Sequence, residues 1–233
     1  MKVLRVLMIM LFIFGCVSKD AKMEELIAHA RDYIKTDEII AQGGKGFLAD
    51  YKERSKIEEN IVKSQTFDVN ILESLLKSEN NSERKKALVI VMIKKITDDK
   101  LLETIIYKYK ANDDYFTKFY SQYCMLNASD KQISSLSEKI FNIYLSETNE
   151  AIIIIGMQNL MRLDNTVSIP FFVKYFKTGS LEVKRAAYVY LKKADGIMLE
   201  NVMSRLKEDK AYDALKIIDG WERGDQGSRR GRP

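Results

Sequence analysis

The residue types that most often do chemistry are scarce in this chain. It has one histidine, His29, and two cysteines, Cys16 and Cys124, among 233 residues. A Cys–His or Ser–His pair would have to use His29, which falls in an amphipathic helical segment far along the chain from Cys124. A zinc site usually needs several Cys or His ligands, so none is expected. We expect His29 to be a solvated helical side chain and Cys124 to be a buried apolar one.

Two other patterns could suggest phosphate binding or acid–base catalysis. The stretch GGKG at residues 43–46 lacks the remainder of a phosphate-binding loop, which would need glycine at position 39 and Ser or Thr at position 46, where Ile39 and Gly46 stand. We interpret it as a linker. The carboxylate pairs at residues 98–99 and 113–114 stand at predicted helix starts, where capping explains them without catalysis. The sequence therefore predicts no catalytic residue, no metal site and no cofactor.

The net charge of +5 is concentrated at the two ends of the chain. Lys2 and Arg5 give the first fifteen residues +2, and four arginines against one aspartate give residues 223–233 +3. The segment between them is neutral. A nucleic-acid-binding face must be basic enough to release counterions from phosphates, so we expect no nucleic-acid partner.

The start of the chain, MKVLRVLMIMLFIFGC, has the parts of a secretory signal peptide. Its apolar run from Val6 to Phe14 would cover less than half of a ~30 Å hydrocarbon core at about 1.5 Å per residue, which is too short to span a membrane. Its end, Ile13-Phe14-Gly15-Cys16, resembles the lipobox of bacterial lipoproteins at Gly15 and Cys16, whereas Phe14 departs from that pattern. The alternative is a plain signal peptide or an uncleaved anchor with an incidental cysteine.

The lipobox resemblance implies cleavage after Gly15 and attachment of acyl chains, palmitate among them, to Cys16. Two or more chains hold a soluble body firmly at a membrane. The resemblance therefore implies a place in the bacterial cell envelope, on an extracytoplasmic membrane face. Val17 and Ser18 lack the acidic residue that retains some lipoproteins at the inner membrane, which slightly favours the outer one.

After the signal segment, the chain consists of short predicted helices with polar breaks. In the clearest unit, residues 169–196, we expect Pro170 in the first turn of one helix and Ser180 as the cap of the next. The second helix, which contains EVKRAAYVYL, resembles the inner helix of a HEAT repeat. A small residue recurs at corresponding positions of four such helices, at spacings of 34, 35 and 31 residues: Ala87, Ser121, Gly156 and Ala187.

This periodicity predicts an all-α fold, an α-solenoid of about five HEAT-like helix pairs preceded by two N-terminal helices at residues 22–35 and 47–64. Tetratricopeptide repeats have a similar period and are the alternative subtype. The expected organisation, in order, is a lipoprotein signal peptide at 1–15, a tether with N-terminal helices at 16–66, the HEAT-like solenoid at 67–222 and a disordered basic tail at 223–233.

In HEAT-like solenoids the second helices of the pairs line a concave surface. Projecting one register over these helices gives a row of candidate protein-binding residues: Phe119, Gln122, Met157, Met161, Arg185, Tyr188 and Lys192. The middle of the row is apolar and partly methionine, a side chain that adapts to irregular partners. The competing interpretation, which we favour, is that the N-terminal helices or a different register bury this row.

The sequence thus predicts a membrane-anchored lipoprotein that acts as a non-enzymatic protein–protein interaction scaffold. Its partners would be the membrane, through lipidated Cys16, and a protein or peptide that the sequence does not identify. The alternative is an enzyme on a HEAT-like scaffold, for example one similar to DNA-alkylpurine glycosylases. Such an enzyme needs a basic concave face and aromatic platforms, which a neutral body with one tryptophan does not favour.

Overall fold

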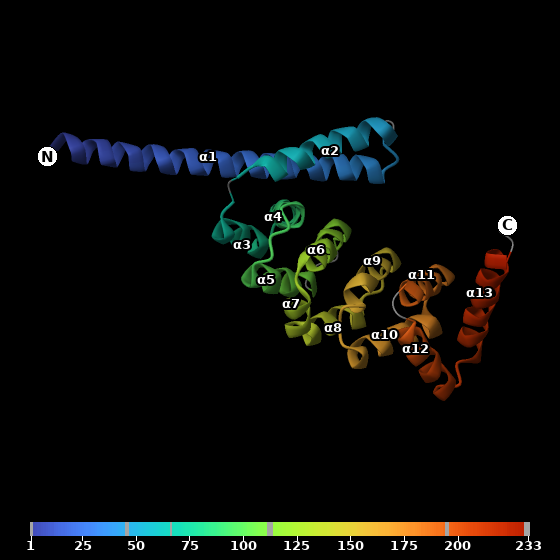
Figure 1. The fold of residues 1–233 in the computed structure, drawn as a ribbon. Coiled ribbons are helices and arrows are strands. Elements are labelled where there is room, and N and C mark those ends of the chain that lie inside the picture. Colours follow the sequence, from blue (N-terminus) through green and yellow to red (C-terminus); the bar gives the residue numbers. More distant parts are fainter. Residues whose placement is uncertain (1, 45–46, 66, 111–113, 194–195, 231–233) are drawn as a thin grey trace. The chain divides into compact units, whose positions relative to one another are not determined.

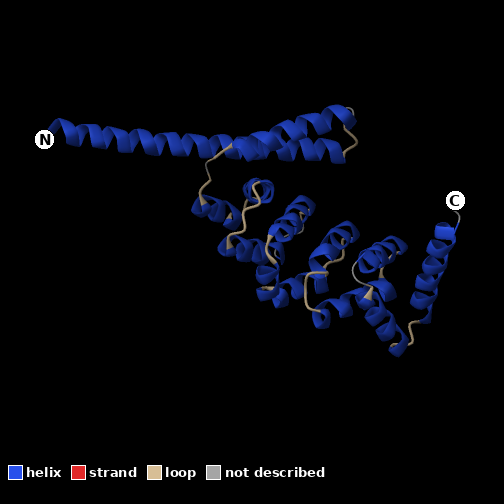
Figure 2. Ribbon diagram, viewed as in Figure 1, coloured by secondary structure: helices blue, strands red, loops and turns tan. Residues whose placement is uncertain are grey.

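The computed structural model describes the backbone of residues 2–44, 47–65, 67–110, 114–193 and 196–230, and most side chains between residues 21 and 223. Every regular element in these ranges is an α-helix and none is a strand, so the predicted all-α class is confirmed (Figure 2). The chain divides into two compact units, Met1–Ala128 and Ser129–Pro233. In the part of the chain that is described, no helix has a stretch both long and apolar enough to cross a bilayer.

Unit 1 is built from the helices that Figure 1 labels α1 to α6. Helix α1 packs against α2 and α4, α3 packs against α4 and α5, and α6 packs against α4 and α5. Their core consists mainly of Leu, Ile and Val side chains with Tyr33 and Tyr120. The bounds are α1 (Lys2–Ala41), α2 (Phe47–Lys63), α3 (Val69–Lys77), α4 (Asn81–Ile93), α5 (Asp99–Lys110) and α6 (Tyr115–Asn127).

Both predicted N-terminal helices are present, but the first is longer than expected. Helix α1 extends from Lys2 to Ala41, and the expected segment 22–35 lies inside it. It ends at two glycines with positive φ, where the Gly44 N–H donates to the Ile39 carbonyl at 2.9 Å and the Gly43 N–H donates to the Ile40 carbonyl at 3.1 Å. This pair of bonds is a glycine cap. The first two residues of GGKG therefore end a helix, and residues 45–46 lie outside the described residues.

Carboxylates and hydroxyls begin several helices, as predicted. The Asp98 side chain accepts a bond from the Leu101 N–H at 3.0 Å, and Asp114 accepts one from the Thr117 N–H at 2.8 Å. Ser180 accepts one from the Val183 N–H at 3.3 Å. Each contact satisfies a backbone donor that the first helical turn leaves unpaired. Capping is thus confirmed for Asp98 and Asp114, whereas residue 113 lies outside the described residues.

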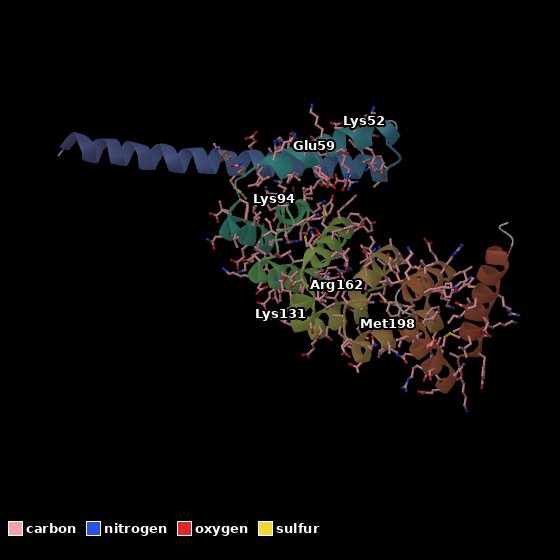
Figure 3. The ribbon with its side chains drawn as sticks, viewed as in Figure 1. Lys52, Glu59, Lys94, Lys131, Arg162 and Met198 are labelled. Carbon is pink, nitrogen blue, oxygen red and sulfur yellow. The ribbon has the colours of Figure 1, made fainter. Side chains whose placement is uncertain are left out.

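Unit 2 is built from α7 to α13. Helix α10 packs against α8, α11 and α12, while α9 packs against α11 and α12 against α13. The Arg162 guanidinium, labelled in Figure 3, lies 2.8 Å from the Asp130 carboxylate and ties the end of α9 to the start of α7. The bounds are α7 (Asp130–Ser135), α8 (Ser137–Ser146), α9 (Glu150–Leu160), α10 (Asn165–Thr178), α11 (Leu181–Lys193), α12 (Ile197–Glu208) and α13 (Tyr212–Arg230).

The expected place of Pro170 in a first helical turn is wrong. Helix α10 begins at Asn165, because the Asp164 side chain caps it by accepting a bond from the Thr166 N–H at 2.8 Å. Pro170 consequently stands inside the helix. Since proline has no N–H, the Thr166 carbonyl cannot receive its usual helical bond from position 170.

The C-terminal helix also differs from the prediction. Its backbone is helical as far as Arg230, whereas the sequence predicts a disordered tail over 223–233. No proline precedes Pro233 in this segment, and arginine and glutamine favour helices, so the turns of α13 can continue into it. The side chains from residue 224 onward lie outside the described residues.

The recurring small residues are buried in both units. Ala87 in α4, Ser121 in α6 and Ala187 in α11 are each at most 1% exposed. Gly156 in α9 has the closest neighbour, because a Cβ atom added there would overlap Cε1 of the buried Tyr144 ring. At this position the tyrosine ring therefore occupies the space that a side chain would need.

We predict that Gly156→Ala lowers the free energy of unfolding by about 1–3 kcal/mol, because the buried Tyr144 ring must move. The control is Gly220→Ala, where an added Cβ has no neighbour within 4 Å. That change should raise stability by roughly 0.5–1 kcal/mol, since glycine inside a helix loses more backbone entropy than alanine. Urea unfolding followed by circular dichroism measures both. A Gly156→Ala variant as stable as the parent would contradict this packing.

Candidate functional site

The strongest candidate for a binding site is a cleft of about 350 Å³ in unit 1. Helices α1, α2 and α6 and the end of α4 contribute its walls. Its lining combines aromatic rings with charged and amide groups, which is the composition of many ligand sites. The lining residues are Tyr33, Arg54, Glu58, Met92, Ile93, Lys95, Phe119, Tyr123 and Asn127.

Helix α6 supplies the aromatic wall of this cleft. Tyr115, Phe119 and Tyr123 recur every four residues and so share one face of the helix. Their ring centroids lie 5.8 Å apart from Tyr115 to Phe119 and 5.0 Å apart from Phe119 to Tyr123. Tyr115 and Tyr123 are each 38% exposed. Unit 1 therefore presents flat apolar surface and phenol hydroxyls to solvent along this row.

The end of α4 contributes the Lys95 side chain to the cleft and a hydrogen bond that holds α6 in place. Lys95 has a φ of 51°, in the left-handed region that non-glycine residues rarely occupy. This conformation ends the helix through a bond from the Ile96 N–H to the Val91 carbonyl at 3.0 Å, and it brings Lys95 to the cleft. The Asn127 amide donates to the Met92 carbonyl at 2.9 Å and thereby ties the end of α6 to the same turn.

A buried polar cluster lies behind the cleft and joins α1, α2 and α6. Arg54 Nε lies 2.8 Å from Asp37 Oδ1, and the Tyr120 hydroxyl donates to Asp37 Oδ2 at 2.9 Å. The Arg54 guanidinium also bonds the Tyr33 hydroxyl and stands over the Tyr33 ring, 5.0 Å from its centroid. Its stacking on one ring and its bond to a carboxylate hold Arg54 where it lines the cleft.

Burial determines the protonation of this cluster. Burial raises the pKa of Tyr33 to about 12 and, with the neighbouring Asp37 carboxylate, raises the pKa of Tyr120. Burial also raises the pKa of Asp37, although Arg54 and the Tyr120 hydroxyl act in the opposite direction. Both phenols therefore stay neutral at physiological pH, where the Tyr120 hydroxyl donates to Asp37 and the Tyr33 hydroxyl accepts from Arg54. The pKa of Arg54 is raised because Tyr33 and Asp37 outweigh its own burial.

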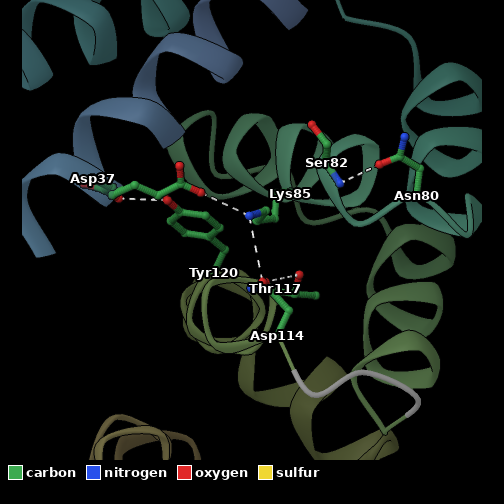
Figure 4. A network of polar contacts seen from close by, with 8 residues as sticks. Asp37, Asn80, Ser82, Lys85, Asp114, Thr117 and Tyr120 are labelled. Atoms are coloured by element: carbon green, nitrogen blue, oxygen red, sulfur yellow. Dashed lines mark hydrogen bonds and ion pairs between the residues drawn. The ribbon is translucent and has the colours of Figure 1, made fainter. Parts of the chain in front are cut away.

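A second polar contact ties α1 to α4 and α6 (Figure 4). Lys85 Nζ lies 3.2 Å from the Glu38 carboxylate of α1 and 3.8 Å from the Asp114 carboxylate that caps α6. It also stands 5.7 Å from the centroid of the Phe116 ring. Because Glu38 follows Asp37 in the chain, two successive carboxylates of α1 together bind three helices, α2 and α6 through Asp37 and α4 through Glu38.

Further along the chain, α2 is fastened to α4 by one lysine. Lys94, labelled in Figure 3 at the end of α4, donates to the Ser64 carbonyl just after α2. Burial lowers the pKa of this lysine. The walls of the cleft are thus held by side-chain bonds at several helix ends.

The structure separates the predicted row of binding residues. Phe119 lines the cleft. Gln122 is fully buried and bonds the Tyr109 hydroxyl at 3.1 Å. In unit 2, Met157 is fully buried and Met161 is half-buried. The middle of the row is therefore part of the core at these positions, in line with the interpretation that we favoured from sequence.

The C-terminal members of the row face another helix of unit 2. Arg185 is exposed, but Tyr188 is 5% exposed and its hydroxyl donates to the Glu222 carboxylate of α13 at 2.6 Å. Lys192 Nζ lies 3.1 Å from the same carboxylate. The Trp221 ring packs on Tyr188 with centroids 5.3 Å apart. Helix α13 therefore covers Tyr188 and Lys192 of the row, and its Trp221 packs on α11.

The residues considered for catalysis lie apart from the cleft lining. His29 is on α1, 3.8 Å from Glu25. Cys124 is 2% exposed, its thiol donates to the Leu88 carbonyl at 3.4 Å, and burial raises its pKa. Among the described residues, no group of three or more His, Cys, Asp or Glu side chains could hold a metal ion. The Cys16 side chain lies outside the described residues.

Sequence reasoning missed most of the cleft. Tyr123 could have been found from its four-residue spacing to Phe119, but nothing in the sequence near Arg54 or Lys95 indicates that they meet this face. No protein-family model, no curated protein and no solved structure matches this chain.

We predict that Tyr120→Phe lowers the free energy of unfolding by about 1.5–3 kcal/mol at neutral pH, because the buried Asp37 carboxylate loses a donor. Tyr107→Phe, at a side chain that is 75% exposed, is the control and should have little effect. Urea unfolding measures both variants. A loss in Tyr120→Phe no larger than in the control would contradict the role of this bond.

The same variant should change the pH dependence of stability. Since burial raises the pKa of Asp37, its contribution to stability is greatest below the pKa of an unfolded carboxyl and declines as pH rises through the folded-state pKa. Without the Tyr120 donor that pKa rises further. The deficit of the variant should therefore shrink as acid protonates Asp37, which unfolding curves over roughly pH 4–7 would show.

Proposed function

We propose that this chain is a membrane-anchored lipoprotein whose helical body is a non-enzymatic scaffold for protein–protein interaction. The observation that carries the interaction half is the unit 1 cleft, where Phe119 and Tyr123 stand beside Arg54 and Lys95. Aromatic and arginine side chains in a partly enclosed pocket are the usual anchors of protein interfaces.

The cleft suits a short extended segment of a partner protein. Its aromatic wall would bury an apolar or proline side chain of that segment. Arg54 and Lys95 would donate hydrogen bonds to the main-chain carbonyls or carboxylates beside it. Arg54 is already oriented by Asp37 and Tyr33, so binding would not have to immobilise it.

We also propose that the helices form an α-solenoid of HEAT-like pairs. Several helices that are adjacent in sequence pack on each other, as in α3 with α4, α5 with α6, and α10 with α11. The buried small residues at corresponding positions of α4, α6, α9 and α11 support this repeat. Each pair would then bury its apolar face only by stacking on the next.

The anchoring half of the proposal is supported by the sequence, through the lipobox-like end at Gly15-Cys16. Acyl chains on Cys16 would hold the body at an extracytoplasmic membrane face of the cell envelope, with the outer membrane slightly favoured. Such an anchor keeps the cleft within a thin layer next to the membrane surface. That confinement raises its effective concentration toward partners in the same membrane.

We predict that the full chain, produced in bacteria with an alkyne analogue of palmitate, takes up the label and sediments with membranes. Cys16→Ser should abolish the label, because the acceptor thiol is absent. Cys124→Ser is the control and should keep it, since Cys124 is buried in unit 1. Gel fluorescence after coupling a dye to the alkyne measures the result. Label retained in Cys16→Ser would contradict lipidation at this residue.

The cleft is tested by replacing Tyr123 with the photoreactive p-benzoylphenylalanine in the membrane-bound chain. Irradiation should give a discrete crosslinked product, and Phe119→Ala in the same chain should reduce its yield about tenfold or more, as expected for loss of a buried aromatic anchor. The same photoreactive residue at Tyr107, which is exposed on α5, is the control. Equal products from the two positions, or none from position 123, would contradict binding in the cleft.

A further inference from the structure

A second groove lies in unit 2, along α10 and beside the end of α12. Its volume is about 550 Å³, and it shares no residue with the unit 1 cleft. Ile169, Pro170 and Val173 form its apolar floor, with Ile169 half-buried, Pro170 exposed and Val173 6% exposed. The floor therefore offers apolar surface that an aliphatic side chain can cover.

Pro170 also changes the backbone of this groove. It stands inside α10, so the Thr166 carbonyl lacks the helical donor that position 170 would normally provide. Both Thr166 and Pro170 line the groove. The missing helical bond thus belongs to two residues of the groove lining.

The charged residues of the groove are mostly cations. Lys174 and Lys177 come from α10 and Arg205 comes from α12, whereas Asp209 is the one carboxylate among the described lining residues. Lys177 lies 3.3 Å from Asp209, and Arg205 lies 3.8 Å from it. Lys174 donates to the Leu145 backbone carbonyl at 3.1 Å, a contact that leaves its charge in place. Glu208 of α12, beside the lining, also lies 2.9 Å from Arg205, so two carboxylates balance two of the three positive charges.

The length of the groove fits a short peptide. Its lining on α10 extends from Asn165 to Thr178, which corresponds to about 20 Å of helix at 1.5 Å per residue. An extended chain rises about 3.3 Å per residue, so roughly six residues would cover this distance. A concave site of that length, with charge along one side, suits a strand-like segment with alternating side chains.

We propose that this groove binds an extended acidic peptide segment of a partner protein, with aliphatic side chains on Ile169 and Pro170 and carboxylates beside Lys174 and Lys177. This goes beyond the function proposed for unit 1, because it concerns a groove in another unit and an occupant that is acidic. A groove along one helix accommodates a narrow peptide segment, whereas the flat surface of an anionic membrane would not enter it. Charge complementarity selects the acidic partner.

The test uses the full chain in detergent and a blocked hexapeptide that alternates glutamate and leucine. Binding measured by calorimetry should weaken as salt is added. It should fall about tenfold when Lys174→Gln and Lys177→Gln are combined, since two exposed charge pairs are lost. Lys216→Gln, at an exposed lysine of α13 outside the groove, is the control and should leave the affinity unchanged.

A second pair of variants tests the floor. Ile169→Ser should weaken binding several-fold, whereas Leu181→Ser, at a leucine of α11 that is 65% exposed, should not. Backbone amide shifts on peptide addition should concentrate in α10 and the end of α12. Equal binding of a peptide with glutamine in place of glutamate would overturn the proposal, as would displacement of the acidic peptide by a short-chain phosphatidylglycerol.

Discussion

The structure depends on how closely neighbouring helices can approach one another. Short helices in water are marginal by themselves and gain their stability by burying one face against a neighbour. Ala87, Ser121 and Ala187 are buried in α4, α6 and α11, and at Gly156 the Tyr144 ring fills the space of the absent side chain. The same close packing buries Gln122 and Met157 of the predicted binding row, so the candidate surfaces for partners are the unit 1 cleft and the groove along α10.

Polar contacts then determine which helices meet around the unit 1 cleft. Successive carboxylates of α1 make two different attachments, Asp37 to Arg54 and Tyr120, and Glu38 to Lys85. These groups are partly removed from water, so each would be costly without its partner. They join α1 to α2, α4 and α6 and leave the Arg54 side chain at the cleft. Unit 1 therefore uses the same residues to hold its helices and to shape its candidate site.

Much of the helical framework could be predicted from sequence, because apolar periodicity and capping residues are local signals. Ser180 and Asp114 cap the helices that they were expected to begin, and the recurring small residues are buried. Pro170 was misplaced because Asp164 caps α10 one turn earlier than the proline suggested. The candidate site was largely missed, since Arg54 and Lys95 meet Phe119 only through tertiary packing. The predicted binding row was found from helical spacing alone. Helical spacing does not tell buried from exposed positions when a helix packs against neighbours on several sides.

Because Cys124 is buried between α4 and α6, its reactivity can be used to measure local opening of unit 1. This thiol lies between α4 and α6, where it is 2% exposed and donates to the Leu88 carbonyl. An alkylating reagent can reach it only during local openings that separate these helices, and its raised pKa disfavours the reactive thiolate until then. The alkylation rate of Cys124 consequently reports how often the α4–α6 contact opens, at the residue that follows Tyr123 of the aromatic wall.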